Sequence, residues 1–400
     1  MKPLTRIACA LALVLPLGGS VLAAQTAPAA GTASPADQAF MRLADRYFDD
    51  YYFPANPSTA TADGLHAWDG KLEDYSRAGV DANIKALGQW QARVAAVDAK
   101  TLGEYVQGDR ELLLNNIRST LLTLQTIRPW QKNPDSYSSG ITSSAFTLME
   151  RKFAPPETRL RALIAREKQM PAALADARRN LDDPPRIYTQ IALEQLPGLV
   201  DFFEHDVPSA FADVADADLK RRFAASNGAV IKALQDYQAW LKTDLLPRSH
   251  GDFRIGAQAY RDKLKYDEMV TLPLDQLIAI DTANMRANQQ QFARVAHELD
   301  PAKTPQQVLA ELAADHPAPD KLLDVFRDSL GKLVAFIRQQ HVITIPSDVL
   351  PLVEETPPFM RATTFASMDT PGPYETVAKE AYLNVTLPDP SWDKQHTDEF

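Results

Sequence analysis

Histidine is the residue type that could hold a metal in this chain, but its spacing argues against a metal site. His297 and Glu298 supply the first half of a helical zinc motif, yet Pro301 occupies the place of the second histidine. A solvated helix end explains this pair better. The histidines stand singly along the sequence, at His66, His205, His250, His297, His316, His341 and His396. We therefore expect no metal site from spacing.

Other patterns that carry chemistry are also incomplete. The sequence contains no Gly-x-Ser-x-Gly turn that would present a serine nucleophile, and Gly331-Lys332 lacks the earlier glycine of a phosphate loop. Adjacent acids such as Glu354-Glu355 could do acid–base work, although such pairs are usually surface charge. We therefore assign no catalytic residue from motifs.

The elements that would position any such residues are mostly helical. From about Asp37 to His341, apolar residues recur three and four positions apart, and prolines separate the stretches. No repeat of fixed period appears, so we expect an irregular multi-helix assembly. Four apolar stripes are interpreted as core-facing helix faces, at residues 40–51, 102–128, 214–246 and 274–299.

After His341 the pattern indicates strands instead of helices. The β-branched run 342–345 and the run Tyr382–Leu387 are typical of short strands set among prolines. The predicted fold is therefore mostly α, with a small β element near the C-terminus. We expect a helical domain over residues 37–341 and a β-containing subdomain that borders a cleft over residues 342–400.

The N-terminal residues indicate export. Residues 1–23 combine a basic start, an apolar stretch and a small-residue site at Val21-Leu22-Ala23, which is the pattern of a secretory signal peptide. Residues 24–36 are interpreted as a flexible leader. The apolar stretch is too short and broken for a membrane span. We therefore expect a periplasmic or secreted protein without a stable membrane anchor.

Composition narrows the function further. The chain carries 42 basic and 52 acidic residues, a net charge of −10, without a basic stripe. An acidic exported protein of this kind is not expected to bind nucleic acid. Its single cysteine, Cys9, would leave with the signal peptide. The mature chain then has no disulfide and no thiolate metal site.

Six segments in a fixed order carry a more specific signal. They are PSTATADGLHAWDGKLEDYS (57–76), DRELLLNNIRSTL with RPWQKNPDSY (109–137), MPAALADARRNLDDPP (170–185), WLKTDLLPRSHGDFRIG (240–256), VITIPSDVLP (342–351) and PYETVAKEAYLNVTLPDPSW (373–392). Together they resemble the bacterial family called domain of unknown function 885, whose members are largely exported and have zinc-metallopeptidase character.

The resemblance implies a mostly helical protein shaped like the helical zinc peptidases, with a small β element bordering a deep cleft. It implies zinc in the full-length family member, held by a His-Glu pair and a following Pro-Gly-His shortly after the segment that matches residues 381–392. The sequence ends at Phe400 before such a motif. We therefore expect the N-terminal part of a zinc-metallopeptidase-like hydrolase that acts on peptides, inactive alone, with no cofactor in this chain.

The run Tyr382–Leu387 is the candidate substrate-binding element. An edge strand can bind an extended peptide through main-chain hydrogen bonds. Because alternate residues on a strand share a face, Tyr382, Asn384 and Thr386 are the candidate substrate-binding residues, and packing within the sheet is the alternative role.

Three further residues lie in the matching segments. We expect His66, Asp69 and Arg254 to hold joints between helices by hydrogen bonds.

The alternative function is a non-catalytic periplasmic helical protein that binds a ligand or acts as a scaffold. A truncated gene product or an incomplete sequence would explain the missing motif. In either case we expect residues 346–400 to lack a packing partner and to be poorly ordered or aggregation-prone.

Overall fold

The computed structural model describes residues 33–345, 347–361, 364–394 and Thr397. The expected signal peptide lies outside the described residues, as does most of the expected leader. The first described helix, α2 (Pro35–Tyr47), begins just before the expected start at Asp37. Ser34 and Asp37 form a capping box, because each side chain accepts a hydrogen bond from the other residue's amide.

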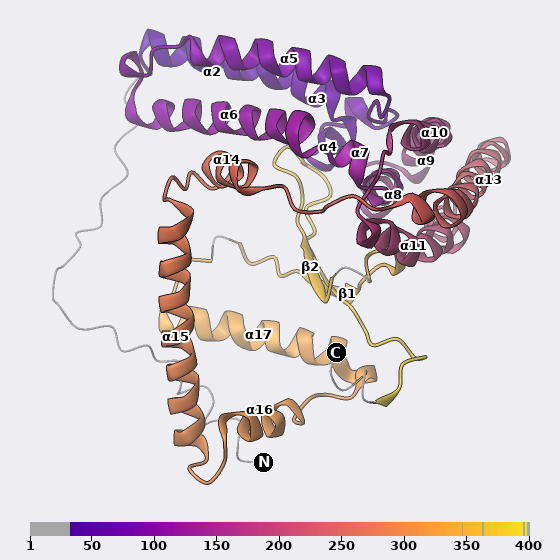
Figure 1. Ribbon diagram of the computed structural model, residues 1–400. Coiled ribbons are helices and arrows are strands. Elements are labelled where there is room, and N and C mark those ends of the chain that lie inside the picture. Colours follow the sequence, from indigo (N-terminus) through magenta and orange to yellow (C-terminus); the bar gives the residue numbers. More distant parts are fainter. Residues whose placement is uncertain (1–32, 346, 362–363, 395–396, 398–400) are drawn as a thin grey trace.

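Helices make up most of the described chain, which confirms the mostly α fold (Figure 1). None of the described helices is both long enough and apolar enough to cross a membrane. After α2 the helices are α3 (Phe53–Ala55), α4 (Pro57–Ala62), α5 (Arg77–Ala95), α6 (Glu104–Leu122), α7 (Pro129–Lys132), α8 (Asp135–Glu150), α9 (Pro156–Glu167), α10 (Met170–Asn180), α11 (Arg186–Asp201), α12 (Val207–Ala210), α13 (Ala217–Trp240), α14 (Ala257–Asp267), α15 (Leu274–Leu299), α16 (Pro305–Ala313) and α17 (Leu322–Gln340).

Two clusters of buried apolar side chains lie between these helices. The smaller joins α2, α5 and α6, the indigo and violet layer of Figure 1, and includes Tyr47 packed edge to face on Trp90. The larger lies among α8, α9, α10, α11 and α13 and includes the fully buried Leu163 and Leu234. The stripes at 40–51, 102–128 and 214–246 therefore face a core, although Tyr105 in the second is exposed.

Proline explains where four of the described helices change course. A wider π-helical turn ends each of them, and a proline follows each turn. Proline has no N–H to donate, and its ring clashes with the carbonyl four residues earlier, so a regular α-helix cannot continue. The turns and their prolines are η1 (Phe48–Tyr52) with Pro54, η4 (Thr123–Ile127) with Pro129, η5 (Phe202–Asp206) with Pro208, and η6 (Leu241–Leu245) with Pro247.

A three-stranded sheet forms the β element in the described part of the chain. Its strands are β1 (Leu352–Glu355), β2 (Ala366–Asp369) and β3 (Tyr382–Val385), in the order β1-β3-β2. The predicted strand at 382–387 is confirmed over most of its length. The run 342–345 does not form the predicted strand, and the first strand of the described residues begins at Leu352.

The position of β3 corrects the expectation of an edge strand. It pairs with β1 in parallel and with β2 antiparallel, so its main-chain groups are engaged on both sides. An extended peptide cannot add to β3 for that reason. Any contact of β3 with a ligand must be made by its side chains.

Glycines allow the β element to sit directly on the helices. Gly64, with φ of +95°, lies against the backbone of Tyr374 and Glu375, and Gly372 lies against the backbone of Ala62 and Asp63. A Cβ atom at Gly372 would come within 2.2 Å of the Ala62 carbonyl oxygen. Only glycine permits such an approach of two backbones.

The β element also contributes to the main core, contrary to the expectation that it lacks a packing partner. Phe359 and Ala378 belong to the larger cluster, and the Phe359 ring packs on Phe202 from η5 at 5.1 Å between centroids. Gly198 of α11 lies close to the Pro358 carbonyl, which brings this segment down onto α11. The helical and β-containing segments therefore share one core.

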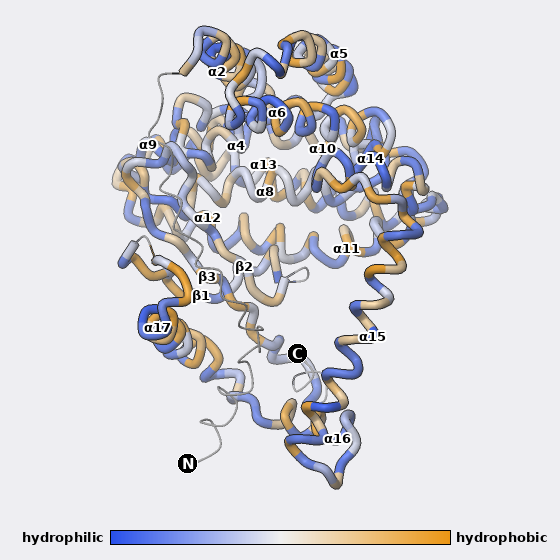
Figure 2. The backbone as a smooth tube through the Cα atoms, turned by 90° about the vertical axis from the view of Figure 1, so that its left-hand side faces the viewer, coloured by the Kyte–Doolittle hydropathy of each residue, from blue (hydrophilic) through white to orange (hydrophobic). Residues whose placement is uncertain are grey.

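The chain from α15 to α17 departs most from the sequence-based expectation. Among the described residues of α15 only Ala296 is buried, while Ile278 is 64% and Met285 is 52% exposed. The stripe at 274–299 is helical but is not core, because α15 leaves the stacked helices and packs mainly on α16. Figure 2 shows α15 and α16 beyond the stacked helices, with hydrophobic positions along α15.

A buried acid at the end of α9 makes stability depend on pH. Glu167 is fully buried and accepts a hydrogen bond from the Ser226 hydroxyl, and burial raises its pKa from an ordinary value near 4.5 to about 8. The folded state therefore binds this proton more tightly than the unfolded state. Its stabilising contribution is full below about pH 4.5 and is lost as pH rises toward 8.

We expect the free energy of unfolding to fall over that pH window by up to about 1.4 kcal/mol per pH unit. Glu167→Gln should remove most of this slope, whereas Glu194→Gln on the exposed side of α11 should keep it. Urea unfolding at several pH values measures both. An unchanged slope in Glu167→Gln would contradict the assignment.

The backbone contact at Gly372 predicts a second stability effect. Gly372→Ala should lower the free energy of unfolding by about 1–3 kcal/mol, because the Ala62 carbonyl must move away. Gly228→Ala is the matched control, since a Cβ there meets no atom of the described chain within 4 Å. It lies inside α13 and should be neutral or stabilise by up to about 1 kcal/mol. Equal unfolding curves for the two variants would show that the contact contributes nothing.

Candidate functional site

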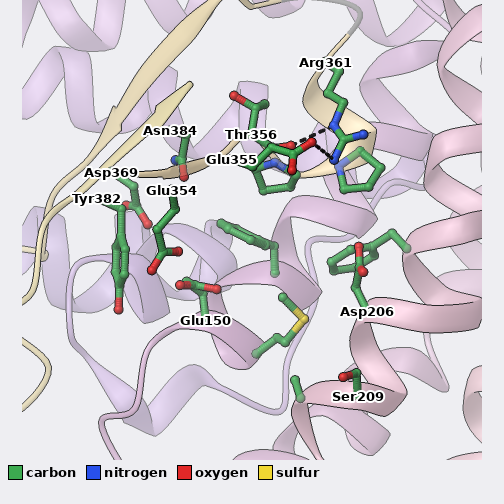
Figure 3. Close-up of a pocket in the computed structure, with 16 residues that line it drawn as sticks. Glu150, Asp206, Ser209, Glu354, Glu355, Thr356, Arg361, Asp369, Tyr382 and Asn384 are labelled. Carbon is green, nitrogen blue, oxygen red and sulfur yellow. Dashed lines mark hydrogen bonds and ion pairs between the residues drawn. The ribbon is translucent and has the colours of Figure 1, made fainter. Parts of the chain in front are cut away.

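A pocket of about 340 Å³ opens between one face of the sheet and the ends of α8, η5 and α12. Its size lies within the range of small-molecule and peptide side-chain sites. Figure 3 shows its lining residues. They are Phe146, Met149, Glu150, Phe202, Asp206, Ser209, Ala210, Glu354, Glu355, Thr356, Pro357, Pro358, Arg361, Asp369, Tyr382 and Asn384.

Strand register brings the polar residues of the sheet together. Glu354 on β1 lies opposite Asn384 on β3, and Asp369 on β2 lies opposite Tyr382. Because side chains alternate along a strand, these four residues share one face. That face meets the helices, so the pocket has a polar floor drawn from three strands.

The helices supply an acid and apolar walls. Glu150 is the last residue of α8, and its side chain reaches toward Glu354 (Figure 3). Phe146 lies one turn earlier on the same helix and packs on Phe359 at 5.5 Å. Phe202 and Asp206 come from η5, whose wider turn is fixed by the proline after it. The π-helical turn therefore helps to aim Asp206 into the pocket.

Arg151 joins the helical wall to the sheet. It is 4% exposed, and its guanidinium forms an ion pair with Asp369 at 2.6 Å. The same guanidinium donates a hydrogen bond of 3.1 Å to the main-chain oxygen of Glu380, just before β3. One side chain thus holds β2 and β3 against the end of α8, next to Glu150.

Crowding of carboxylates perturbs the chemistry of the floor. Burial raises the pKa of Glu150, and repulsion from Glu354 and Asp369 raises it further. Burial, with the charges of Glu150, Glu380 and Glu354, raises the pKa of the Tyr382 hydroxyl to about 12. Tyr382 is therefore a neutral hydrogen-bond donor at physiological pH, and Glu150 holds a proton more readily than an ordinary glutamate.

The opposite end of the pocket is neutralised internally. Arg361 forms an ion pair with Glu355 at 2.8 Å and donates to the main-chain oxygen of Thr356. Burial raises the pKa of Asp206, with repulsion from Asp201 adding to the shift, while Arg361 acts in the other direction. The balance of charge is therefore most negative at the end that holds Glu150 and Glu354.

The three substrate-binding residues expected from the sequence fall in two places. Tyr382 and Asn384 line the pocket described above. Thr386 follows the end of β3, donates a 2.6 Å hydrogen bond to the Thr364 oxygen, and lines a different pocket beside α17. The shared face therefore extends over Tyr382 and Asn384, and a substrate role for all three stays a prediction.

The residues expected to hold joints between helices behave differently from one another. His66 hydrogen-bonds Asp69 at 3.3 Å and Glu375 at 3.1 Å, and its ring stacks on Phe153 at 3.6 Å. It therefore fastens the turn after α4 to the segment before β3, so His66 and Asp69 form hydrogen bonds at a joint as predicted, but this joint connects a helical turn to the β-containing segment and not two helices. Within the described residues Arg254 pairs only with nearby Asp252 on the surface, so the prediction for Arg254 was wrong.

The carboxylate of Glu375 is well held at this joint. Burial raises its pKa, but hydrogen bonds from the amides of Val377 and Ala378 and from His66 outweigh that effect, so the pKa lies below its ordinary value.

The described residues do not fit a zinc ion. Among them no group of three or more histidine, cysteine, aspartate or glutamate side chains is arranged to hold a metal. The pocket carboxylates are instead divided, since Asp369 is paired with Arg151 and Glu355 with Arg361. No metal-dependent step is therefore derived for the described part of the chain.

Sequence reasoning found part of this site and missed part. Glu354 and Glu355 stood out as adjacent acids. Glu150, Asp206 and Asp369 did not, since each is a single acid with no motif around it. The available signal in the sequence was the adjacent opposite charges of Glu150 and Arg151 at the end of a helix.

Comparisons with known proteins agree on the family and the fold. The model of a family described as "Bacterial protein of unknown function (DUF885)" matches residues 57–399. A search of curated proteins found no match.

Two solved structures are similar to the chain. One is "a putative lipoprotein of unknown function" from Shewanella oneidensis, with a TM-score of 0.68 and 24% identity over 90% of this chain and 66% of that one. The other is "the putative lipoprotein" from Colwellia psychrerythraea, with a TM-score of 0.66 and 13% identity over 88% of this chain and 68% of that one. This chain therefore spans about two thirds of their length.

Removal of Arg151 should loosen the sheet. Arg151→Met keeps the side-chain bulk but leaves Asp369 and the Glu380 oxygen without their partner, which should lower the free energy of unfolding by about 1–3 kcal/mol. Amides of β3 should be strongly protected from hydrogen exchange in the unmodified chain and lose protection in the variant.

The matched control is Arg221→Met, because Arg221 pairs with Asp218 on the surface of α13 and is well exposed. It should change stability by less than about 1 kcal/mol and leave exchange in β3 unaltered. Weak protection of residues 382–385 in the unmodified chain would show that β3 is not held as described.

Proposed function

The chain belongs to the DUF885 family of bacterial proteins, and from that premise we propose that it forms the substrate-binding part of an exported hydrolase that acts on peptides. The pocket over the sheet supports this proposal, because it combines apolar walls with a few converging polar groups. The described residues bind and orient the peptide. Export rests on the N-terminal sequence and agrees with the names of the two solved relatives, which are called putative lipoproteins.

The observation that carries the proposal is a polar floor in which one buried residue, Asn384, has no internal partner for its side chain. Asn384 is 5% exposed, and its side chain has no hydrogen-bond partner among the described residues, yet it lines the pocket. A peptide group can satisfy both ends of the Asn384 side-chain amide, since it offers one donor and one acceptor.

The apolar walls would hold a side chain of the same peptide. Phe146, Met149 and Phe202 line the side of the pocket that faces the sheet. Aromatic rings and methionine adapt to apolar groups of varied shape. The main chain of the peptide would then lie along the polar floor, with its side chain against the helices.

Hydrolysis is expected to require groups beyond the described residues. The described part of the chain places no set of metal ligands near the pocket. In this proposal the purified chain binds peptides and leaves them intact. Zinc stays an expectation from the family resemblance, and no step of this proposal depends on it.

Peptide binding by the purified chain tests the proposal. A mixture of short peptides is incubated with the chain, bound peptides are identified by mass spectrometry, and affinity is measured by calorimetry. Asn384→Leu should weaken binding about fivefold or more, because it removes a hydrogen-bond donor and an acceptor at similar side-chain size. Tyr382→Phe removes a single hydroxyl and should weaken binding less. Mass spectrometry of the same mixture should show no cleavage products.

Asn288→Leu is the matched control, because Asn288 is exposed on α15, away from this pocket. It should leave affinity unchanged. Thermal unfolding of each variant checks that the fold is kept. An affinity that is unchanged in both pocket variants would show that the peptide binds elsewhere. Cleavage by the purified chain would overturn the claim that it only binds peptides.

A further inference from the structure

The charge of the pocket is strongly unbalanced. Five carboxylates line it, at Glu150, Asp206, Glu354, Glu355 and Asp369, against one guanidinium at Arg361. Two of the carboxylates are matched by arginines, Glu355 by Arg361 and Asp369 by Arg151. The remaining negative charge is therefore concentrated where Glu150 approaches Glu354.

Glu150 and Glu354 have no ion pair in the described part of the chain, and their charges repel one another. Both point into the same end of the pocket (Figure 3). Like charges held together in a partly buried site destabilise the empty site. A positive group placed between them would remove that repulsion and gain attraction to both.

Two neutral polar groups at the same end give an independent indication of a ligand. Asn384, which lies opposite Glu354 on the next strand, is 5% exposed, and its side-chain amide has no partner among the described residues. The Tyr382 hydroxyl, on a residue that is 8% exposed, likewise has no described partner. A buried polar group that faces a cavity and lacks a partner marks a place where a ligand is hydrogen-bonded.

We propose that this end of the pocket is a subsite for a protonated amine of the peptide, either its free amino terminus or a lysine side chain. Glu150 and Glu354 neutralise the ammonium, and the Asn384 side-chain oxygen accepts one of its hydrogen bonds. The inference rests on the proposed peptide-binding function, since it specifies which peptides that pocket takes.

The walls favour an organic amine over a simple cation. Phe146 and Met149 line the same pocket, are only partly buried, and offer apolar surface to the carbon chain that bears the ammonium. A bare divalent cation would gain nothing from these walls. The described residues also lack a cluster suited to a metal ion.

Three matched tripeptides test the subsite by calorimetry with the purified chain. Gly-Gly-Gly amide carries only an amino-terminal ammonium. Acetyl-Gly-Lys-Gly amide carries only a lysine ammonium, and acetyl-Gly-Gln-Gly amide carries no charge. At least one charged peptide should bind tenfold or more tightly than the neutral one, and the advantage should shrink as salt rises. The charged peptide with the higher affinity identifies the source of the amine.

Charge-neutral variants locate the effect. Glu354→Gln and Glu150→Gln should each weaken the preferred charged peptide about tenfold and leave the neutral peptide unchanged. Glu194→Gln, an exposed acid of α11 outside the pocket, should change neither. Since these substitutions keep side-chain size, thermal unfolding should show intact folds.

The outcomes separate this inference from the proposed function. Equal affinity for charged and neutral peptides would overturn the amine subsite while peptide binding stands. If no peptide binds but butylammonium binds in a Glu354-dependent way, the subsite stands and the peptide function fails. Displacement of the charged peptide by millimolar Ca²⁺ or Mg²⁺, with loss of that effect in Glu354→Gln, would instead assign a divalent cation and overturn the inference.

Discussion

The site exists because the β element is fastened to the helices. The pocket is lined both by the β element and by the ends of helices, so neither part alone encloses it. Arg151 provides the central link, because its buried guanidinium ties Asp369 on β2 and the chain before β3 to the end of α8. The close backbone contact of Gly64 and Gly372 with their opposite segments, and the bridge from His66 to Glu375, hold the same two parts together nearby.

Local structure was predictable from the sequence because it depends on neighbours along the chain. Apolar periodicity located the long helices, and the run at 382–387 located β3. Strand order was not predictable, because it depends on pairing between distant segments. β3 is the central strand because both β1 and β2 pair with it. The stripe on α15 shows the same limit. Periodicity gives a helix an apolar face but does not say what covers it, and Ile278 and Met285 remain exposed.

The candidate site also combines residues that local pattern could predict with residues that only tertiary contacts bring together. Strand alternation placed Tyr382 and Asn384 on one face, and both line the pocket. The acids that oppose them could not be found in this way, because Arg151 and Asp369, whose ion pair sets the geometry, are 218 positions apart in the chain. Single acids such as Glu150 carry no motif. Their role follows only from the tertiary contacts that bring them to one cavity.

The polar floor is an arrangement that stability alone would not favour. Burial of Glu150 and its repulsion from the carboxylates of Glu354 and Asp369 disfavour the charged form of that side chain in the folded state. In the main core the buried Asn180 side chain donates hydrogen bonds to the Tyr75 main-chain oxygen and to the Tyr137 hydroxyl. Local conflicts of this kind concentrate at functional sites, where a ligand relieves them. Asn384 instead lines a cavity, without a partner among the described residues and beside carboxylates that have no ion pair, and this combination is the main physical reason to regard the pocket as a binding site.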